Sequence, residues 1–408
     1  MELDLGPEVD AFRLEMREWI KSNAPEGLAE LAAWNLPQTG SANLVDERTK
    51  ATLHPAYVQW EKNLISAGLV CPNWPQEYGG RGLSPIEMVV FEEECQHAGV
   101  PRIERGLAER IAGPAILIHG TPEQKAKFLP RIVTGEDVYC QGYSEPDHGS
   151  DLAGIETKGV VDGDEIVITG HKIWTSGAKR ANMIFILCRT DPDAPRHRGI
   201  SYVLAAFTPE NGVELHPVMQ MNGSDQFCEE FFEGTRAPLT NVIGGLNKGW
   251  GPAMSTLAFE RGGKATILHL GFEIQYWDLV REVQERGQST DPVVRQKLAW
   301  AYTNVSIMRF AGLRLTAQIA AGKAPGPESS ISKVFRTEYH RRFGEIALNL
   351  AGPQSLIRPQ GDGYPLSYWQ DVFLSSRAAT IYSGTSEIQR NIMGERALGL
   401  PKEPSVVG

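Results

Sequence analysis

The chain has no long apolar run and no block of basic residues. None of its apolar stretches approaches the roughly 20 residues needed to span a bilayer. Its first 20 residues are acidic and amphipathic, unlike a secretory signal or a transit peptide. The formal net charge of the 408 residues is −10, and Lys and Arg are not clustered, which argues against a nucleic-acid partner. We therefore expect a cytoplasmic globular protein with no membrane span.

The chain also lacks the patterns of a disulfide framework or a metal site. Its five cysteines are odd in number, widely spaced and without a Cys-x-x-Cys pair, which predicts reduced thiols in a reducing compartment. The nine histidines include no i, i+4 pair and no carboxylate–histidine motif. The sequence therefore predicts no bound metal.

The first third of the chain, residues 1–136, has helical periodicity. Apolar residues from Val9 to Ile20 recur on one helical face. Ser84 precedes Pro85 and stands three residues before Glu87, the spacing of a capping box at a helix start. These patterns predict an N-terminal helical domain.

The periodicity changes twice after that. Residues 137–244 contain short segments rich in β-branched and aromatic residues, separated by Gly, Pro and Asp, which predicts a small β-barrel or sandwich. Residues 245–408 contain three long helical segments and a fourth helix after Gly384, which predicts a four-helix bundle. The predicted class is α+β, with a helical domain, a central β domain and a C-terminal bundle.

Three short motifs carry the chemistry. They are "YCQGYSEPDHGSDLAGIETKG" at 139–159, "TGHKIWTSGAKRAN" at 169–182 and "IYSGTSEIQRNI" at 381–392. Small residues, hydroxyls and one tryptophan suit the close approach of a flat ring and a phosphate. Each motif alone also has an ordinary structural explanation: a tight loop capped by Glu145 and Asp151, a core Trp before a hairpin turn, and a helix start capped by Thr385.

Together, and in this order, the motifs resemble those of the acyl-CoA dehydrogenase family of flavoproteins. The resemblance covers the whole chain through the Y-S-E-P-x-x-G-S-D loop, the G-x-K-x-W turn and the Y-x-G-T-S-x-I-Q-R ending. It implies FAD between the β domain and the bundle, and oxidation of an acyl-CoA thioester to the trans-2-enoyl-CoA. It also implies electron-transfer flavoprotein as the usual electron acceptor, and a place in fatty acid or sterol catabolism.

The resemblance assigns roles to individual positions. Trp174 would pack against the isoalloxazine ring, and Ser176 would donate a hydrogen bond toward its N5. The implied cofactor-binding residues are Gln141, Tyr143, Ser144, Gly149, Ser150, Trp174, Thr175, Ser176, Arg286, Thr385 and Glu387. The implied substrate-binding residues are Ser150, Arg261, Ser383 and Gly384. The backbone N–H of Ser383 would help to hold the thioester carbonyl.

Several positions depart from the family pattern. Tyr143 stands where an aliphatic residue is usual, and His148 where a small one is usual. The R-x-x-F-G motif is reduced to Arg286, and "LNLAGPQSLI" replaces a glycine-rich segment. Because both segments normally reach FAD across a subunit interface, we expect a homo- or hetero-oligomer in which a second subunit holds the adenine end.

The catalytic base is absent from its most frequent place. Removing the α proton requires a carboxylate within hydrogen-bond reach, and Ser383 occupies the position where many relatives carry one. Other members of the family carry the base on the first bundle helix, directly before an arginine. Here Glu260 precedes Arg261, with Gly262 and Gly263 after them. The sequence therefore predicts Glu260 as the catalytic base.

Two alternatives and the choice of substrate remain open at this point. The same fold supports acyl-CoA oxidases and flavin monooxygenases, in which O2 takes the electrons. The chain could also be a partner subunit of a heteromeric dehydrogenase. The "DPVVRQKLA" segment resembles bacterial enzymes that act on bulky or dicarboxylic acyl-CoAs.

Overall fold

The computed structural model describes residues 6–28, 54–262, 268–320, 326, 329–357, 359 and 366–402. The chain divides into two compact units, which are taken separately below. Among the described residues, the first unit takes in 6–28, 54–220 and 225–260. The second takes in 221–224 and the residues from Arg261 onward.

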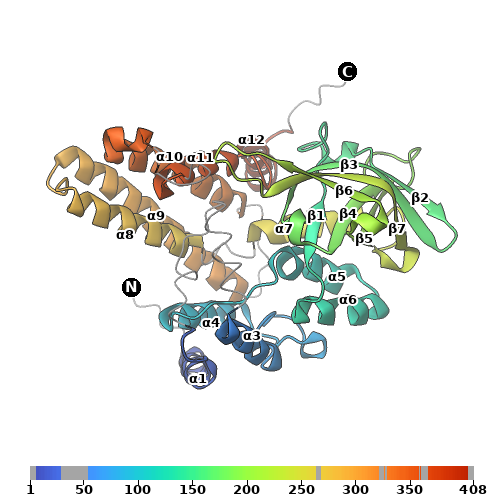
Figure 1. Cartoon of the computed structure of the whole chain (residues 1–408), viewed down its shortest axis with the longest axis horizontal. Helices are drawn as coiled ribbons and strands as arrows, with labels where there is room; N and C mark the ends of the chain where they lie inside the picture. The colour runs from blue at the N-terminus through green and yellow to red at the C-terminus, as the bar shows by residue number, and fades with distance from the viewer. Residues whose placement is uncertain are drawn as a thin grey trace. The chain divides into compact units, whose positions relative to one another are not determined.

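The first unit begins with helices, blue to teal in Figure 1. They are α1 (Pro7–Asn23), α3 (Pro55–Ser66), α4 (Pro85–His97), α5 (Gly113–His119) and α6 (Pro122–Thr134). The predicted face of α1 is confirmed, since Phe12, Met16 and Ile20 are buried. The predicted capping box of α4 is also confirmed, because Ser84 Oγ accepts from the Glu87 backbone and Glu87 accepts from the Ser84 N–H.

A single connected sheet of eight strands follows within residues 139–243, all of which are described. The strands are β1 (Tyr139–Gly142), β2 (Lys158–Asp162), β3 (Glu165–Ser176), β4 (Met183–Arg189), β5 (Ile200–Ala206), β6 (Val213–Val218), β7 (Phe227–Pro238) and β8 (Val242–Ile243). The strand order is β6-β7-β3-β2-β4-β5-β8, and β1 pairs with β4 in parallel. The helix α7 (Trp250–Gly262) comes next.

Strands β4 and β5 are buried on both faces, because two cores meet at the sheet. Phe185 of β4 and Tyr202 of β5 belong to the core that the N-terminal helices share. Their sequence neighbours Ile184 and Val203 belong to a second core, together with the inner residues of β3 and β7. Side chains that alternate along a strand thus supply both cores.

The second unit is helical. Its helices are α8 (Leu268–Glu285), α9 (Pro292–Ala320), α10 (Ser329–Ala351), α11 (Tyr368–Ala378) and α12 (Ser386–Ile392). Its core contains Leu279, Ala301, Phe343 and Val372, one from each of α8 to α11. Buried apolar residues from four helices make this a helical bundle.

The predicted α+β class is confirmed, with helices before and after the sheet. The sequence patterns did not indicate the short strands β1, β2 and β8, nor α11, which Ser367 and Gln370 start with a capping box. The segment predicted as one long helix contains α7 and α8, and residues 263–267 between them lie outside the described part of the chain. The division at 136/137 and 244/245 stays a prediction.

The absences expected from the sequence concern cysteines, metals and membranes. All five cysteines are free and buried. Within the described ranges, no helix is long and apolar enough to cross a bilayer. The same residues contain no cluster of His, Cys, Asp and Glu that could hold a metal ion.

Candidate active site

Trp174 is the extra residue of a β-bulge. Strand β3 pairs with β7, and the register shifts between Ile173 and Thr175. Trp174 has a φ of 66°, in the left-handed region that costs most side chains about 1–2 kcal/mol. Its indole is 56% exposed and meets Phe227 edge-on, with the ring centroids 6.4 Å apart. A large aromatic side chain is thus presented at the surface against its own backbone preference, as at many binding sites.

The neighbours of Trp174 alternate between interior and surface. Thr175 is 1% exposed, and its Oγ1 lies 3.1 Å from the Gln141 carbonyl oxygen and 2.8 Å from Glu230 Oε2. Ser176 is exposed. The Thr175 side chain therefore points inward, and only the backbone of this residue is available for the predicted cofactor contact. Ser176 presents its side chain at the surface.

A buried ion pair holds the loop that follows β1. Lys172 is 0% exposed, and its Nζ donates to Glu145 Oε1 at 2.8 Å and to the Tyr143 carbonyl at 3.1 Å. Glu145 also accepts from the backbone N–H groups of Glu156 and Thr157, at 2.6 and 2.9 Å. Burial alone would raise the pKa of Glu145, but the Lys172 charge and these N–H groups lower it overall.

This anchoring leaves the predicted cofactor-binding residues of the loop on the outside. Ser144 is partly exposed and its carbonyl accepts from the Ile173 N–H at 2.9 Å, which joins the loop to the strand that leads into Trp174. Gly149 and Ser150 are exposed. The capping role considered for Glu145 is present, and it serves the same loop whose small residues are predicted to meet the cofactor.

Tyr143 packs into the interior. It is 4% exposed, its ring meets Phe185 and Tyr202 edge-on, and its hydroxyl lies 2.6 Å from Thr256 Oγ1 on α7. Only the backbone of Tyr143 is therefore available for the predicted cofactor contact. Its side chain instead joins the loop to the helix that carries Glu260.

The last motif forms a strained turn in the second unit. Ser383 has a φ of 57° and Gly384 a φ of 83°. The buried Gln389 donates from Nε2 to the Ser383 carbonyl at 3.3 Å. A Cβ at residue 384 would lie 2.4 Å from that nitrogen. Thr385 caps α12 by accepting from the Ile388 N–H at 3.2 Å. Residues of α12 thus hold the turn that precedes this helix.

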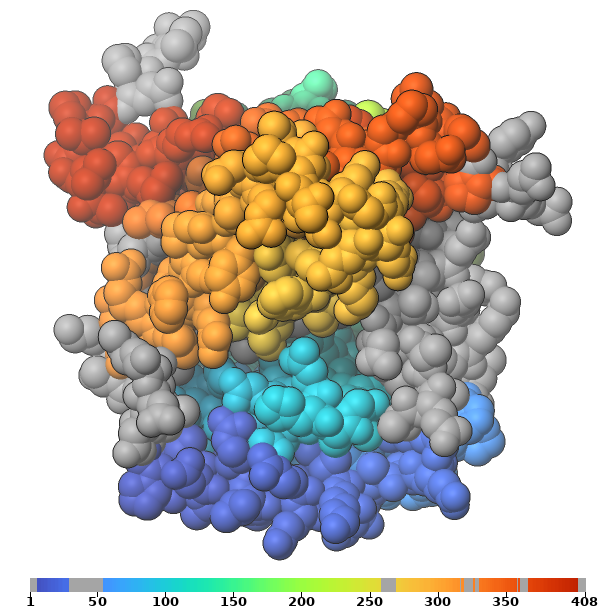
Figure 2. Space-filling view, turned by 90° about the vertical axis from the view of Figure 1, so that its left-hand side faces the viewer, coloured from blue at the N-terminus to red at the C-terminus, as the bar shows by residue number. Residues whose placement is uncertain are grey.

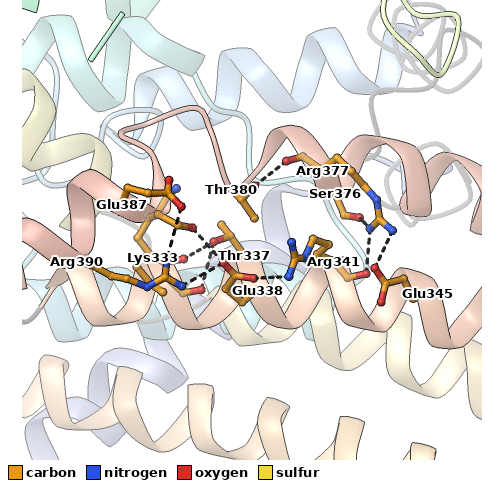
Figure 3. Close-up of polar contacts among 12 residues, drawn as sticks. Lys333, Thr337, Glu338, Arg341, Glu345, Ser376, Arg377, Thr380, Glu387 and Arg390 are labelled. Carbon is orange, nitrogen blue, oxygen red and sulfur yellow. Dashed lines mark hydrogen bonds and ion pairs between the residues drawn. The ribbon is translucent and has the colours of Figure 1, made fainter. Parts of the chain in front are cut away.

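Helix α12 is fastened to α10 by Glu338 (Figure 3). Glu338 accepts from Ser386 Oγ at 3.2 Å and from Arg390 at 3.4 Å, and it pairs with Arg341 at 3.0 Å. Figure 3 shows Arg390 of α12 and Arg341 of α10 on either side of Glu338. The predicted site residues Thr385 and Glu387 therefore lie at the start of a helix that is bonded to α10.

Glu387 is exposed and held in its charged form. Its own backbone N–H lowers its pKa most, and the Thr385 hydroxyl, Arg390 and the buried Lys333 lower it further. Arg390 Nη1 lies 3.7 Å from its carboxylate. An anion in this position suits hydrogen-bond acceptance from a ligand better than proton abstraction, since a carboxylate with a lowered pKa is a weaker base.

The remaining predicted residues are less constrained. Arg286 donates to Glu282 at 2.9 Å and to the Leu350 carbonyl at 3.4 Å, and its side chain is 37% exposed. Glu260 and Arg261 lie on α7, but their side chains fall outside the described part of the structure. Their roles stay predictions.

Three residues of the site were not singled out in the sequence. Lys172 and Gln389 are the lysine and glutamine of the second and third motifs, so their place in those motifs was a signal. Glu230 lies in the segment "FCEEFF" beside two other charged or aromatic residues, and nothing in that pattern marks it as buried.

Because of Glu230, we expect the stability of the folded protein to depend on pH. Burial raises its pKa to about 8, above an ordinary value of 4.5; Thr175 and Lys172 lower it and Glu229 raises it. Between these two values the unfolded chain releases a proton that the folded chain keeps. Stability therefore falls as pH rises, by up to ~1.4 kcal/mol per pH unit.

Glu230→Gln has no such proton to lose. We expect the difference in free energy of unfolding between Glu230→Gln and wild type to change by about 2–4 kcal/mol in favour of the variant from pH 5 to pH 8. The measurement is urea denaturation at each pH. Glu229→Gln, at a partly exposed neighbouring position, should follow wild type. Parallel pH profiles for Glu230→Gln and wild type would contradict the raised pKa.

Known protein families match most of the chain. Models of the acyl-CoA dehydrogenase N-terminal, middle and C-terminal domains match residues 38–136, 140–234 and 247–398. Acyl-CoA dehydrogenase IpdE1 of Mycobacterium tuberculosis (strain ATCC 25618 / H37Rv) is 37% identical over 396 residues, which cover 97% of this chain and 99% of the relative.

Two solved structures resemble the whole chain. The Tcur3481-Tcur3483 steroid ACAD has a TM-score of 0.78 at 30% identity, over 99% of this chain and 100% of the other. The ChsE4-ChsE5 complex from Mycobacterium tuberculosis has a TM-score of 0.75 at 28% identity, over 99% and 100%. The chain therefore belongs to the acyl-CoA dehydrogenase family of flavoprotein oxidoreductases.

Proposed function

We propose that the protein oxidises an acyl-CoA thioester to the trans-2-enoyl-CoA with FAD as cofactor, and that electron-transfer flavoprotein takes the electrons. The observation that carries the proposal is the exposed, left-handed Trp174, flanked by the exposed Ser176 and by the anchored loop of Ser144 and Ser150. A surface indole with hydroxyl groups beside it fits a flat heteroaromatic ring that accepts hydrogen bonds at its edge.

The residues of this chain divide the work. FAD, when bound, supplies the hydride acceptor. Glu260 takes the α proton, and the Ser383 backbone N–H stabilises the charge that develops on the thioester carbonyl. Cofactor contacts come from the loop of Ser144, from the Trp174 bulge and from the α12 start. Substrate contacts come from Ser150, Arg261, Ser383 and Gly384, and Arg286 serves the adenine end.

The substrate class we propose is a bulky, steroid-derived acyl-CoA. Support comes from the relatives, since a solved structure at 30% identity is titled a steroid ACAD. A second possibility, a branched dicarboxylic acyl-CoA, is favoured by 29% identity to a (2S)-methylsuccinyl-CoA dehydrogenase of Cereibacter sphaeroides. The two classes differ in charge and in size, so one panel of substrates separates them.

The test uses the purified chain reconstituted with FAD and mixed anaerobically with a panel of acyl-CoAs. Bleaching of the flavin absorbance by steroid-derived acyl-CoAs, followed by reoxidation by electron-transfer flavoprotein, is the expected result. Rapid reoxidation by O2 with release of hydrogen peroxide would instead identify an oxidase. No bleaching by any acyl-CoA, with flavin bound, would contradict the proposal.

We further propose that the active form is an oligomer with itself or with a related chain. The two solved structures above each combine two named chains, Tcur3481 with Tcur3483 and ChsE4 with ChsE5. In this protein, α8 and α9 (yellow to orange in Figure 2) carry several exposed apolar side chains. They are Ile274, Trp277, Tyr302, Ile307 and Phe310, each more than 40% exposed. A groove of about 420 Å³ beside Phe310 runs between α9 and α10.

Exposed apolar surface of this kind marks protein interfaces. We expect Phe310→Glu to shift the protein to a smaller species in light scattering, because a carboxylate would be buried in the interface. Leu356→Glu, at an 86% exposed position outside α8 and α9, should leave the mass unchanged. An unaltered mass for Phe310→Glu would exclude the surface around Phe310 from the interface.

A further inference from the structure

Glu230 lies under the Trp174 bulge and has no part in the chemistry proposed above. It is 0% exposed on β7, and its Oε2 lies 2.8 Å from Thr175 Oγ1. Its Oε1 is buried and has no hydrogen-bond partner among the residues that the structure describes. Thr175 follows Trp174 directly, so this carboxyl is one side chain away from the predicted flavin-facing residue.

The residues around Glu230 compensate a negative charge there only in part. Lys172 is its cross-strand partner on β3, but the Lys172 ammonium bonds to Glu145 and the Tyr143 carbonyl. The structure describes both side chains and contains no ion pair between Lys172 and Glu230. The other titratable groups nearby are Cys140 on β1 and Cys228 and Glu229 on β7 itself. On β6, the cross-strand partner is the apolar Leu215.

The hydrogen count at Thr175 indicates which form of Glu230 is present. The hydroxyl has one hydrogen and two acceptors within reach, the Gln141 carbonyl at 3.1 Å and Glu230 Oε2 at 2.8 Å. Both contacts are full hydrogen bonds only if the neutral carboxyl of Glu230 donates to Thr175, which then donates to Gln141. An ionised, buried carboxylate with one oxygen unpartnered would be strongly disfavoured.

We propose that Glu230 is a positioning residue for the flavin site, acting as a neutral acid that donates through Thr175 to the Gln141 carbonyl. This chain of hydrogen bonds joins β7, β3 and β1 directly beneath the bulge. It holds the Thr175 side chain inward, and the alternation along β3 then places Trp174 and Ser176 outward. Ionisation of Glu230 removes the donor, so Thr175 turns its hydrogen to the carboxylate and releases Gln141. The inference rests on the proposed FAD-dependent function.

The test is the dissociation constant of FAD, measured on the full-length protein, with its partner chain if one copurifies, from about pH 6 to pH 9.5. For wild type we expect the constant to rise at least ~5-fold over this range, as a loss of one internal hydrogen bond implies. Glu230→Gln should stay within about 2-fold, because the amide donates to Thr175 at every pH.

Three further variants complete the test. Thr175→Val keeps the shape but removes the hydroxyl, and should weaken FAD binding at every pH. Thr175→Ser restores the hydroxyl and should follow wild type, as should Glu229→Gln. If Glu230→Gln shows the wild-type pH profile, the positioning role is wrong while the proposed function stands. If wild type and Glu229→Gln bind no FAD at any pH, alone or with the partner chain, both proposals fail.

Discussion

Glu260→Gln should slow the reduction of the flavin by acyl-CoA by about 10²–10⁴-fold, the usual share of general-base catalysis. Gln keeps the size and the hydrogen-bonding capacity of the side chain but has no basic lone pair. Glu260 is the carboxylate that stands directly before an arginine on α7, the alternative place for the base in this family. FAD content should stay normal. The measurement is stopped-flow absorbance under anaerobic conditions.

Ser383→Ala is the matched control for this variant. It should reduce the rate far less, because the proposed role of residue 383 uses only its backbone N–H. A wild-type rate of flavin reduction in Glu260→Gln would show that another carboxylate is the base. Asp225 would be examined first, although its carboxylate already pairs with Lys179 at 2.5 Å.

Relocating the carboxylate offers a sharper test. Combining Glu260→Gly with Ser383→Glu places a carboxylate where many relatives carry it. The backbone at residue 383 is already left-handed, so the second change adds no new conformational strain. We expect some activity to return relative to Glu260→Gly alone, with an altered substrate preference because the acyl group must pass a different wall.

Gly384→Ala should lower kcat/KM for the best acyl-CoA by about 10²-fold, the loss caused by misplacing one donor to a developing oxyanion. The residue has a φ of 83°, where a side chain is strained, and the new Cβ would lie 2.4 Å from Gln389 Nε2. Gln389 is fully buried and holds the Ser383 carbonyl at 3.3 Å. Its displacement would therefore release the Ser383 carbonyl and let residue 383, whose N–H is proposed to hold the thioester, change its conformation.

Gly287→Ala separates this effect from backbone strain alone. Gly287 also has a positive φ, 67°, but a Cβ there would meet no atom within 4 Å. It should lose stability by about 1 kcal/mol and keep its activity. Equal activities for the two variants would show that the Gly384 turn does not position a catalytic group.

The sequence by itself determined the class of fold and the family. The helical periodicity of α1, the capping box at Ser84 and the β-branched segments of the central strands are local features, and each appears in the structure as predicted. The three motifs were sufficient for the family because their residues are close together in the chain. They also located the Trp174 bulge and the turn at Ser383 as places of interest.

Only the tertiary structure decided which way the site's side chains point. Tyr143 and Thr175 stand in motifs that predict cofactor contact, yet both turn inward, onto Thr256 and onto Glu230. Motif spacing cannot show this, because the partners come from strands and helices 55 to 113 residues away. The state of Glu230 depends on the same long-range packing, since its protonation follows from burial between strands whose pairing no short segment encodes.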